Sequence, residues 1–505
     1  MNLTSITRGL LSHRLKQMQT AMANVEVTQT RVMQQLITKA ANTEWGTAHG
    51  FSNIHSYQQF AAAMPVSQYD NLAPWIQRMR QGEPNILWPG RVRCYAKSSG
   101  TTSSRSKFIP VSADALRDTH YRGGTDTVAW YLHHHPQSRL IDGKALILGG
   151  SRDEALSDAH QMTGDLSAIL IQNTNPLVNW LRATSRQTAL MADFEQKRLS
   201  IAREVMHRDV TNLSGVPSWM MSVLQCVLQL SGKDSLLDVW PHLEVFFHGG
   251  VAFGPYRKQY NQMLPSDSMH YMETYNASEG FFALQDCPGE RGMSLMTDYG
   301  VFYEFIPMDQ LSGDSPSAVP LWGVETGRNY AMLITTSSGL WRYMIGDTVQ
   351  FTSTNPYRIV ITGRTQSYIN AFGEELMVGN ADTAIERTCS QTGATVLEYT
   401  AAPVFMDSDV KCSHQWLIEF DSMPDNLDHF TTLLDSELRT LNSDYDAKRH
   451  HDVTLQMPTI TVARRNLFHD WLQENGKLGG QHKVPRLSNQ RLIIDSMLKM
   501  NTPLT

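Results

Sequence analysis

The sequence predicts a mixed α/β protein with a large N-terminal domain and a small C-terminal domain. A chain of 505 residues is too long for a single hydrophobic core, so more than one domain is expected. Helical periodicity alternates with short apolar runs of β type along residues 1–365, and a shorter alternation fills residues 366–505. We place the boundary near Arg364–Asn370 and expect a compact α+β module after it.

Composition and charge argue against several classes of protein. Hydrophobic residues make up 41% and charged residues 18% of the chain, as in an ordinary globular protein. The net charge is −6, so the balance does not point to nucleic acid or an anionic membrane surface as partner. The apolar runs fall short of the ~20 residues that span a bilayer. We therefore expect neither nucleic acid nor a membrane as partner.

The five cysteines are scattered and form no C-x-x-C pair. This argues against a disulfide framework or a zinc site and predicts a reducing, cytoplasmic location. The run His133–His135 is interpreted as a solvated helix end, because no second ligand group stands at a suitable spacing for a metal. No acidic residue precedes Glu26, a composition that a transit peptide can share. An amphipathic helix is favoured, with an apolar face of Leu10, Leu11, Leu15 and Met18.

The elements expected in the large domain follow in order. Residues 1–90 are predicted to be mostly helical, with breaks at Gly82 and Pro89-Gly90. Two short strands around a loop are expected within 91–112, then a helix at 113–135. A buried strand is expected at Lys144–Leu148, and helices over 185–240. From there the pattern becomes β. Strands are predicted at Leu243–Phe247, Val301–Ile306, Tyr330–Thr335, Leu340–Ile345, Val349–Thr352 and Arg358–Thr362.

The small domain alternates between helices and strands. In the large domain, Ser337-Ser338-Gly339 is predicted to be a hairpin turn between the strands Tyr330–Thr335 and Leu340–Ile345. In the small domain, helices are expected near 375–391, 426–441 and 464–475. Strands are expected at Thr395–Thr400 and Gln415–Phe420, with two short ones near 453–463.

A loop rich in serine, threonine and glycine is the first candidate site. It reads Ser98-Ser99-Gly100-Thr101-Thr102, lies between two predicted strands and is followed by Lys107. Backbone N–H groups, hydroxyls and a lysine can all bind phosphate oxygens, and glycine permits close approach. The loop is not a Walker motif, and taken alone such a composition is more often a plain turn.

Two further segments could contact a nucleotide. In Tyr275–Gly280 a tyrosine can stack on a purine, and Glu279 can hold Mg²⁺ through its oxygens. The alternative is a strand end with a solvated acid. In Arg342–Asp347 the glycine turns the chain, and Asp347 can accept hydrogen bonds from both ribose hydroxyls. A hairpin with a turn aspartate has the same pattern.

Three more segments are weaker signals. Phe247–Val251 is an apolar strand that ends in Gly249-Gly250, against which a flat ring can lie. Gly363-Arg364 lies at the start of the proposed interdomain linker. Gln481–Arg486 is a basic loop preceded by glycines, so Lys483 could swing toward a phosphate. The alternatives are a plain glycine turn and an exposed basic loop.

The order of these segments resembles that of the acyl-adenylate-forming superfamily, which includes acyl-CoA synthetases, peptide-synthetase adenylation domains and luciferases. More narrowly, the chain resembles the Gretchen Hagen family of acyl acid amido synthetases, the auxin-responsive promoter family, in its bacterial type. The resemblance spans nearly the whole chain. The matching segments are Thr43–Gly46, Met64–Asp70, Gly82–Gly90, Lys97–Thr102, Lys107–Pro110, Gly249–Tyr256, Tyr275, Arg342–Asp347 and Gln481–Arg486.

The resemblance implies a fold and a set of residue roles. The large domain would contain β-sheets and a β-barrel flanked by helices, and the small domain would move over the active site. Lys107, Glu279 and Lys483 would be catalytic, and Glu279 would hold Mg²⁺. ATP and AMP would be bound by Ser98, Ser99, Gly100, Thr101, Thr102, Gly249, Gly250, Tyr275, Ser278, Tyr343, Asp347 and Arg364.

The function implied is ATP-dependent adenylation of a carboxylic acid, followed by transfer of the acyl group to an amine or amino acid. Two departures from the family pattern leave the identity of the acid and of the amine undetermined. His248 precedes the glycines, and the hinge segment Asn370–Glu375 differs from the plant form. An acyl- or aryl-CoA ligase and a non-catalytic nucleotide-binding protein are the alternatives. We expect a monomer or a weak homodimer. Candidates for the acid pocket are Tyr121, Trp130, Tyr131 and Trp180.

Overall fold

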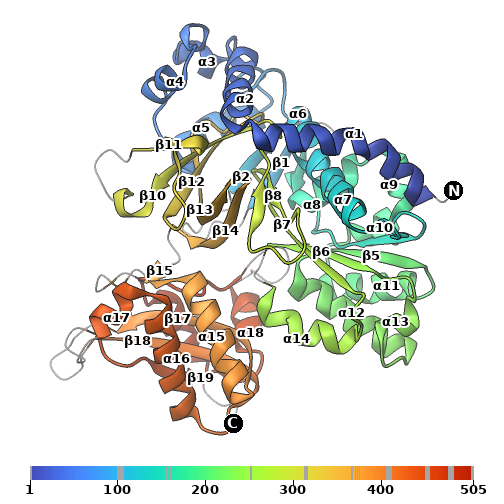
Figure 1. Ribbon diagram of the computed structural model, residues 1–505, viewed down its shortest axis with the longest axis vertical. Helices are drawn as coiled ribbons and strands as arrows, with labels where there is room; N and C mark the ends of the chain where they lie inside the picture. The colour runs from blue at the N-terminus through green and yellow to red at the C-terminus, as the bar shows by residue number, and fades with distance from the viewer. Residues whose placement is uncertain are drawn as a thin grey trace. The chain divides into compact units, whose positions relative to one another are not determined.

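The chain folds into two compact units, each described by itself below (Figure 1). The first comprises Met1–Ile345 with Gln350–Val360, and the second comprises Gly346–Val349 with Ile361–Thr505. The computed structural model describes residues 3–98, 107–153, 156–157, 161–250, 253–311, 317–365, 368–369, 371, 374, 376–404, 412–449, 455–475 and 483–501.

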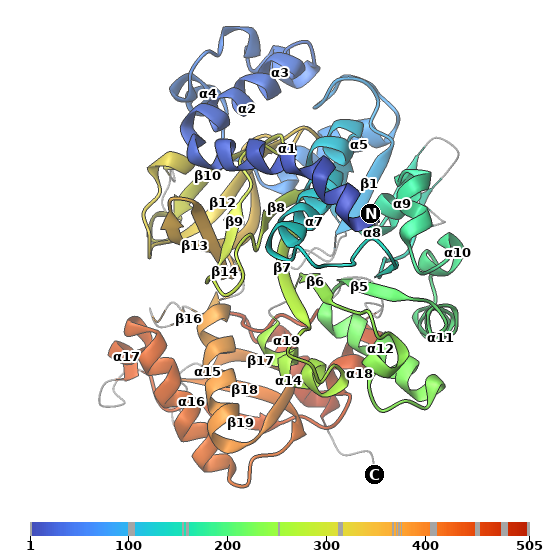
Figure 2. The same ribbon diagram turned by 45° about the vertical axis from the view of Figure 1, so that its right-hand side comes forward.

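Helices open the first unit. α1 packs against α7, as both Figure 1 and Figure 2 show, and Arg14 ties the contact through ion pairs with Asp126 (2.7 Å) and Asp298 (2.6 Å). The N-terminal amphipathic helix is therefore present and buries Leu15 and Met18, whereas Leu10 is 75% exposed and does not belong to its apolar face. The opening elements are α1 (Leu3–Ala23), α2 (Val25–Ala40), α3 (Glu44–Ala48), η1 (Phe51–Asn53), α4 (Tyr57–Ala63) and α5 (Tyr69–Arg80).

One long mixed sheet forms the centre of the first unit, in the order β11-β10-β12-β13-β14-β9-β8-β7-β6-β5-β3. Its strands are β3 (Lys144–Ile147), β5 (Val210–Gly215), β6 (Val245–Gly249), β7 (His270–Ala277), β8 (Gly280–Leu284), β9 (Met293–Leu295), β10 (Val301–Pro307), β11 (Val319–Pro320), β12 (Asn329–Thr336), β13 (Tyr343–Thr354) and β14 (Tyr357–Arg364). The run from β3 to β7 is parallel, and β7 pairs with β8 in the antiparallel sense. β8 and β9, β9 and β14, β10 and β12, and β10 and β11 also pair in the antiparallel sense.

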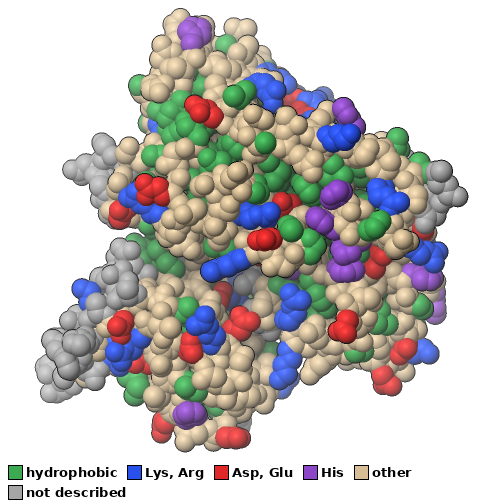
Figure 3. Space-filling view, viewed as in Figure 1, with side chains coloured by type: hydrophobic (Ala, Val, Ile, Leu, Met, Phe, Trp, Pro, Cys, Tyr) green, Lys and Arg blue, Asp and Glu red, His purple; other side chains and the backbone are tan. Residues whose placement is uncertain are grey.

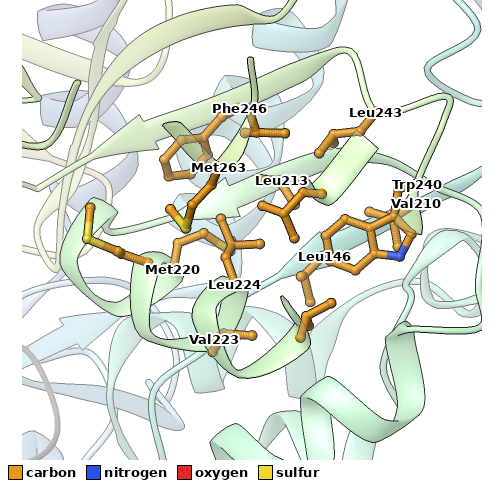
Figure 4. Close-up of a cluster of buried hydrophobic side chains, with 14 of the residues drawn as sticks. Leu146, Val210, Leu213, Met220, Val223, Leu224, Trp240, Leu243, Phe246 and Met263 are labelled. Carbon is orange, nitrogen blue, oxygen red and sulfur yellow. The ribbon is translucent and has the colours of Figure 1, made fainter. Parts of the chain in front are cut away.

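The parallel half of the sheet is buried, as its near-continuous apolar strands predict. Figure 4 shows side chains of β5 and β6, such as Leu213 and Phe246, facing those of α12, such as Leu224. Trp240 closes one end and donates its indole N–H to the carbonyl of Val205 at 3.0 Å. Each such side chain contributes about 1.5–3 kcal/mol on burial. The helices of this region are α11 (Phe194–Val205), α12 (Pro217–Ser231), α13 (Leu236–Val239) and α14 (Gly254–Met263).

A second, three-stranded sheet has the order β2-β1-β4. The helix predicted at 113–135 is continuous but contains a π-helical turn, η2. The elements of this region are β1 (Cys94–Ser98), β2 (Lys107–Val111), α6 (Ala113–Ala115), η2 (Leu116–Tyr121), α7 (Arg122–His134), β4 (Met162–Gly164), α8 (Leu166–Asn173), α9 (Pro176–Leu181) and α10 (Arg186–Ala189). Short 3-10 turns lie at η4 (Met308–Gln310) and η5 (Leu321–Gly323).

The second unit is an α+β module around the sheet β17-β18-β19. The sequence did not indicate α17 or α19, and one of the two strands expected near 453–463 lies in the described residues, as β19. The elements are β15 (Tyr368–Ile369), β16 (Leu376–Met377), α15 (Val378–Thr392), β17 (Thr395–Val404), β18 (Ser413–Ser422), α16 (Leu427–Leu441), α17 (Ser443–Arg449), β19 (Thr459–Val462), α18 (Leu467–Glu474) and α19 (Leu492–Met500).

The five cysteines are free, and Cys94, Cys226 and Cys412 are buried. Of the helices in the described ranges, none combines the length and the apolar character needed to cross a membrane.

Candidate active site

The β7–β8 hairpin carries three of the predicted nucleotide-site residues. Ala277 pairs with Gly280, so Ser278 and Glu279 are the two loop residues of a tight hairpin. Glu279 is only 9% exposed, and the Tyr275 ring packs against Phe282 with centroids 5.0 Å apart. A Cβ at Gly280 would lie 2.7 Å from the Phe282 ring, so glycine is what lets the turn approach its neighbours. The hairpin thus holds a carboxylate at its tip and an aromatic ring on its strand.

The two glycines at the end of β6 lie beside this hairpin. Gly249 pairs with Thr274, next to Tyr275, and a Cβ on Gly249 would meet the Thr274 carbonyl oxygen at 2.3 Å. Gly250 has a φ of +79°, in the left-handed region that favours glycine. The structure therefore brings Gly249, Gly250 and Tyr275 together at the ends of two neighbouring strands.

His248, which departs from the small residue common at this point, faces the aromatic core. Its ring stacks on Phe253 with centroids 4.2 Å apart. Burial, and then the charge of Arg257, lower the pKa of His248 to about 3, so the imidazole is neutral. This histidine is therefore an uncharged part of the aromatic packing around Phe253.

Lys107 is the first residue of β2 and stands directly opposite Ser98 of β1. It is half-buried, with its Nζ 5.8 Å from the centroid of the Tyr69 ring. Tyr69 in turn accepts a hydrogen bond from the Phe108 N–H at 2.8 Å. The predicted phosphate-loop residues Ser99, Gly100, Thr101 and Thr102 lie outside the described residues, as does the side chain of Ser98.

Tyr343 begins β13 and is fully buried. Its neighbour Arg342 has a φ of +42°, and this kink delays the strand that we expected at Leu340 until Tyr343. The Arg342 guanidinium forms a buried ion pair with Glu304 (2.8 Å) and donates to the carbonyl of Met64 (2.6 Å). We infer that Arg342 anchors the start of β13, a role that its place in the predicted Arg342–Asp347 segment did not reveal.

In the second unit, Asp347 and Arg364 form an ion pair, with Arg364 Nε 3.1 Å from Asp347 Oδ1. The contact is held by hydrogen bonds between the strand ends. Thr362 donates to Thr348 through their hydroxyls at 2.9 Å, and the Thr365 N–H donates to the Gly346 carbonyl at 2.8 Å. Asp347 is 8% exposed, whereas the Arg364 side chain is 48% exposed, so the carboxylate is the enclosed partner of this pair.

Lys483 lies in the electrostatic field of this pair. Lys483 is exposed to solvent, yet desolvation of the ammonium, together with the charges of Arg486 and Arg364, lowers the pKa of Lys483 to about 8. The carboxylates of Glu398 and Asp347 act in the opposite direction. The predicted residues Asp347, Arg364 and Lys483 therefore meet in one unit. Sequence reasoning missed Glu398, which no motif marks.

Glu279 fits a magnesium ion that is shared with a nucleotide. Among the described residues, no group of three or more His, Cys, Asp or Glu side chains could hold a metal by itself. Mg²⁺ is usually bound by one or two carboxylates, with substrate phosphates and water as its remaining ligands. A single, mostly buried carboxylate at a hairpin tip meets that requirement.

Histidine side chains gather on one face of the first unit (Figure 3). The rings of His135 and His270 lie 3.9 Å apart, and the Tyr131 hydroxyl is 3.1 Å from His270 Nδ1. Burial, then His270 and His134, lower the pKa of His135 to about 4. The end of α7 therefore packs against the first residue of β7 and is less solvated than we predicted for the run His133–His135.

The aromatic residues proposed for the acid pocket have different environments. Trp130 and Tyr131 are buried in a core cluster, which favours an ordinary packing role. Trp180 is 62% exposed on α9, with Lys144 Nζ 4.0 Å from its ring centroid. Tyr121 is half-buried and donates its hydroxyl to the Leu170 carbonyl at 2.9 Å.

The fold defined by these sheets and sites is that of acyl-adenylate-forming enzymes. A GH3.15 acyl acid amido synthetase structure superposes with a TM-score of 0.76 at 17% identity, covering 96% of each chain. A 2-hydroxyisobutyryl-CoA ligase bound to an acyl-AMP superposes with a TM-score of 0.58 at 12% identity, covering 94% of this chain and 91% of the ligase. These likenesses establish the fold.

Sequence comparison identifies the family. Residues 14–269 match the GH3 family N-terminal domain, residues 294–364 the central domain and residues 379–492 the C-terminal domain. The chain belongs to the GH3 family, the Gretchen Hagen family that the motifs resemble. Indole-3-acetic acid-amido synthetase GH3.8 of Oryza sativa subsp. indica is 25% identical, over 92% of this chain and 88% of the relative.

Proposed function

We propose that this protein is an ATP-dependent acyl acid amido synthetase, an AMP-forming ligase that makes carbon–nitrogen bonds. The observation that carries the proposal is the family match, which runs through both compact units of the chain. The curated relative named above is an amido synthetase of nearly the same extent. The site geometry supports the proposal, because a carboxylate hairpin, a glycine wall and an aspartate–arginine–lysine group are the parts that a nucleotide site needs.

In the first step the substrate carboxylate attacks the α-phosphorus of ATP. An oxygen–phosphorus bond forms, the bond between the α- and β-phosphates breaks, and pyrophosphate leaves with the electron pair. The product is a mixed acyl–phosphate anhydride. This activation is needed because a carboxylate has only oxide as a leaving group, whereas the anhydride can expel AMP.

The residues of the chain would serve this step by holding two anions together. Lys107 and the Ser98–Thr102 loop would bind the phosphates, and Gly249, Gly250, Tyr275, Ser278 and Tyr343 would line the nucleoside. Mg²⁺ held by Glu279 would supply charge neutralisation at the phosphates. In the second unit, Asp347 would accept the ribose hydroxyls beside Arg364, and Lys483 would donate to the reacting phosphate.

In the second step an amine attacks the acyl carbon. A carbon–nitrogen bond forms, the bond to the AMP oxygen breaks, and the amine loses a proton to water or buffer. An amino acid is a suitable acceptor because its α-amine has a pKa of about 7.7–8.0 and is partly neutral near pH 7. We infer that the chain works in the cytoplasm as a monomer or weak homodimer, on small molecules rather than nucleic acid or membrane.

Pyrophosphate exchange with a panel of aromatic and fatty acids tests the adenylation step. At least one acid is expected to drive exchange, with a requirement for Mg²⁺. AMP release is then measured with mixed amino acids or with coenzyme A as acceptor, and the products are identified by mass spectrometry. Acceleration by coenzyme A alone would instead make the protein an acyl-CoA ligase. ATP binding without turnover across the panel would make it a non-catalytic nucleotide-binding protein.

A further inference from the structure

The residues after Lys483 lie along β17, where Leu487 pairs with Ala401 in an isolated parallel bridge. The Ala401 N–H donates to the Arg486 carbonyl at 2.8 Å, and the Ser488 N–H donates to the Ala401 carbonyl at 3.1 Å. The Thr400 hydroxyl donates to the Pro485 carbonyl at 2.7 Å. These bonds fix the chain from two residues beyond the lysine onward.

Two side chains connect this segment to a helix. The Arg486 guanidinium forms an ion pair with Asp382 of α15 at 2.5 Å, and both side chains are 16% exposed. Asp382 also accepts a hydrogen bond from the Tyr399 hydroxyl, and the guanidinium lies 5.3 Å from the centroid of the Tyr399 ring. Charge-assisted hydrogen bonds of this kind are about twice as strong as neutral ones. Segment, strand and helix therefore meet at Asp382.

We propose that the Asp382–Arg486 pair is a positioning device that holds Lys483 in place for adenylation, an inference that rests on the proposed function. Lys483 stands three residues before Arg486, whose charge acts on its ammonium. Without the pair, the lysine would keep its charge but lose its fixed position. A displacement of about 1 Å at a reacting centre can reduce a rate about 100-fold.

The charges that face Lys483 provide a readout of its position. They are Arg486 on its own segment, Glu398 on β17, Arg364 on β14 and Asp347 on β13. Together with desolvation they hold the pKa of Lys483 at about 8, against an ordinary value of 10.5. If the segment leaves this place, the pKa of Lys483 rises toward the ordinary value. A role of the pair in stability alone would leave that pKa unchanged.

The test compares the variants Asp382→Asn and Arg486→Lys with Asp470→Asn, which weakens a comparable ion pair with Arg464 in the same unit (2.7 Å). The pKa of Lys483 is measured in the resting protein by amine-selective acetylation across pH and peptide mass spectrometry. Asp382→Asn is expected to raise it, whereas Asp470→Asn leaves it near 8. In Arg486→Lys the positive charge remains but the planar guanidinium is lost. A raised pKa of Lys483 in this variant would show that the position of Lys483 depends on the geometry of the ion pair and not on charge alone.

Kinetics then separate positioning from general damage. In Asp382→Asn, pyrophosphate exchange is expected to fall about 10- to 100-fold, while amide formation from synthetic acyl-adenylate is unchanged. An unchanged pKa of Lys483, or an equal loss in both half-reactions, would overturn the inference. If the wild-type protein adenylates no acid, the proposed function fails, and the acetylation measurement still decides whether the pair positions the lysine.

Discussion

At the residue scale, the proposed chemistry depends on a few charged side chains whose surroundings the structure defines. Lys107 is half-buried at the start of β2, and Glu279 is enclosed at a hairpin tip. Charges held before the reaction begins stabilise a transition state more than charges that must reorganise. The fixed placement of these groups is therefore the feature to test.

Replacing Lys107 with alanine is expected to reduce the rate of adenylation about 10²- to 10³-fold, because one fixed positive charge opposite the phosphates is lost. Lys107 is an edge residue of β2 and is only half-buried, so the far-ultraviolet circular dichroism spectrum should not change. Pyrophosphate exchange measures the rate. A wild-type rate in this variant would remove Lys107 from the mechanism.

The pKa of Lys483, lowered to about 8, predicts an alkaline limit to adenylation. The cationic form is the one that stabilises phosphate charge, and it is lost as pH rises through that pKa. The rate of pyrophosphate exchange should therefore fall above about pH 8. Lys483→Arg should react more slowly but without this decline, because arginine stays protonated. A decline of equal size in Lys483→Arg would assign the limit to another group.

At the element scale, the sequence predicted those helices and strands whose pattern is local. Two examples are the predicted strand Lys144–Leu148, which includes β3, and the predicted strand Thr395–Thr400, which lies within β17. Both predictions succeeded because continuous or alternating apolar runs are typical of strands. The π-helical turn Leu116–Tyr121 and the late start of β13 at Tyr343 were not predicted. Each is accompanied by a contact distant in sequence: Arg342 pairs with Glu304 before β13, and Thr119 in the π-helical turn donates to the Tyr299 carbonyl. A local sequence pattern does not report such contacts.

The packing of α7 on β8 gives a matched pair of stability predictions. A Cβ at Gly123 would lie 2.3 Å from the Phe281 ring, whereas one at Gly124 would meet nothing within 4 Å. Gly123→Ala should lower the free energy of unfolding by about 1–3 kcal/mol through overpacking. Gly124→Ala should raise it by about 0.5–1 kcal/mol through its helical propensity. Urea unfolding followed by tryptophan fluorescence measures both, and similar values for the two variants would contradict the packing.

At the scale of the whole molecule, the order of motifs carried more information than any single motif. The Tyr275–Gly280 and Arg342–Asp347 segments each match ordinary turns, and their interpretation as nucleotide contacts depended on the family resemblance. Family membership is now established, and the fold agrees. Glu398 and Asp382 could not be found from the sequence, since an isolated acid on a strand or helix has no pattern that distinguishes it.

The distribution of the proposed site over two units predicts a movement during the reaction. Lys107 and Glu279 belong to the first unit, whereas Asp347 and Lys483 belong to the second. Lys483 is proposed to contact a phosphate in the first step, but the second step needs an open path for an amine to the acyl carbon. One placement of the second unit serves these needs poorly, and relative motion is the default expectation for compact units within one chain.

Distances between labels on the two units test this movement. Spin labels attached through noncanonical amino acids at exposed Lys233 and Asp428 report one unit each. The distance distribution should differ between protein with ATP analogue and acid and protein with a stable acyl-adenylate analogue and amino acid. Two labels within the first unit, at Lys233 and Lys258, serve as the control and should not respond. Identical distributions in the two ligand states would mean that both half-reactions use one arrangement, and the proposed mobility of the second unit would then be wrong.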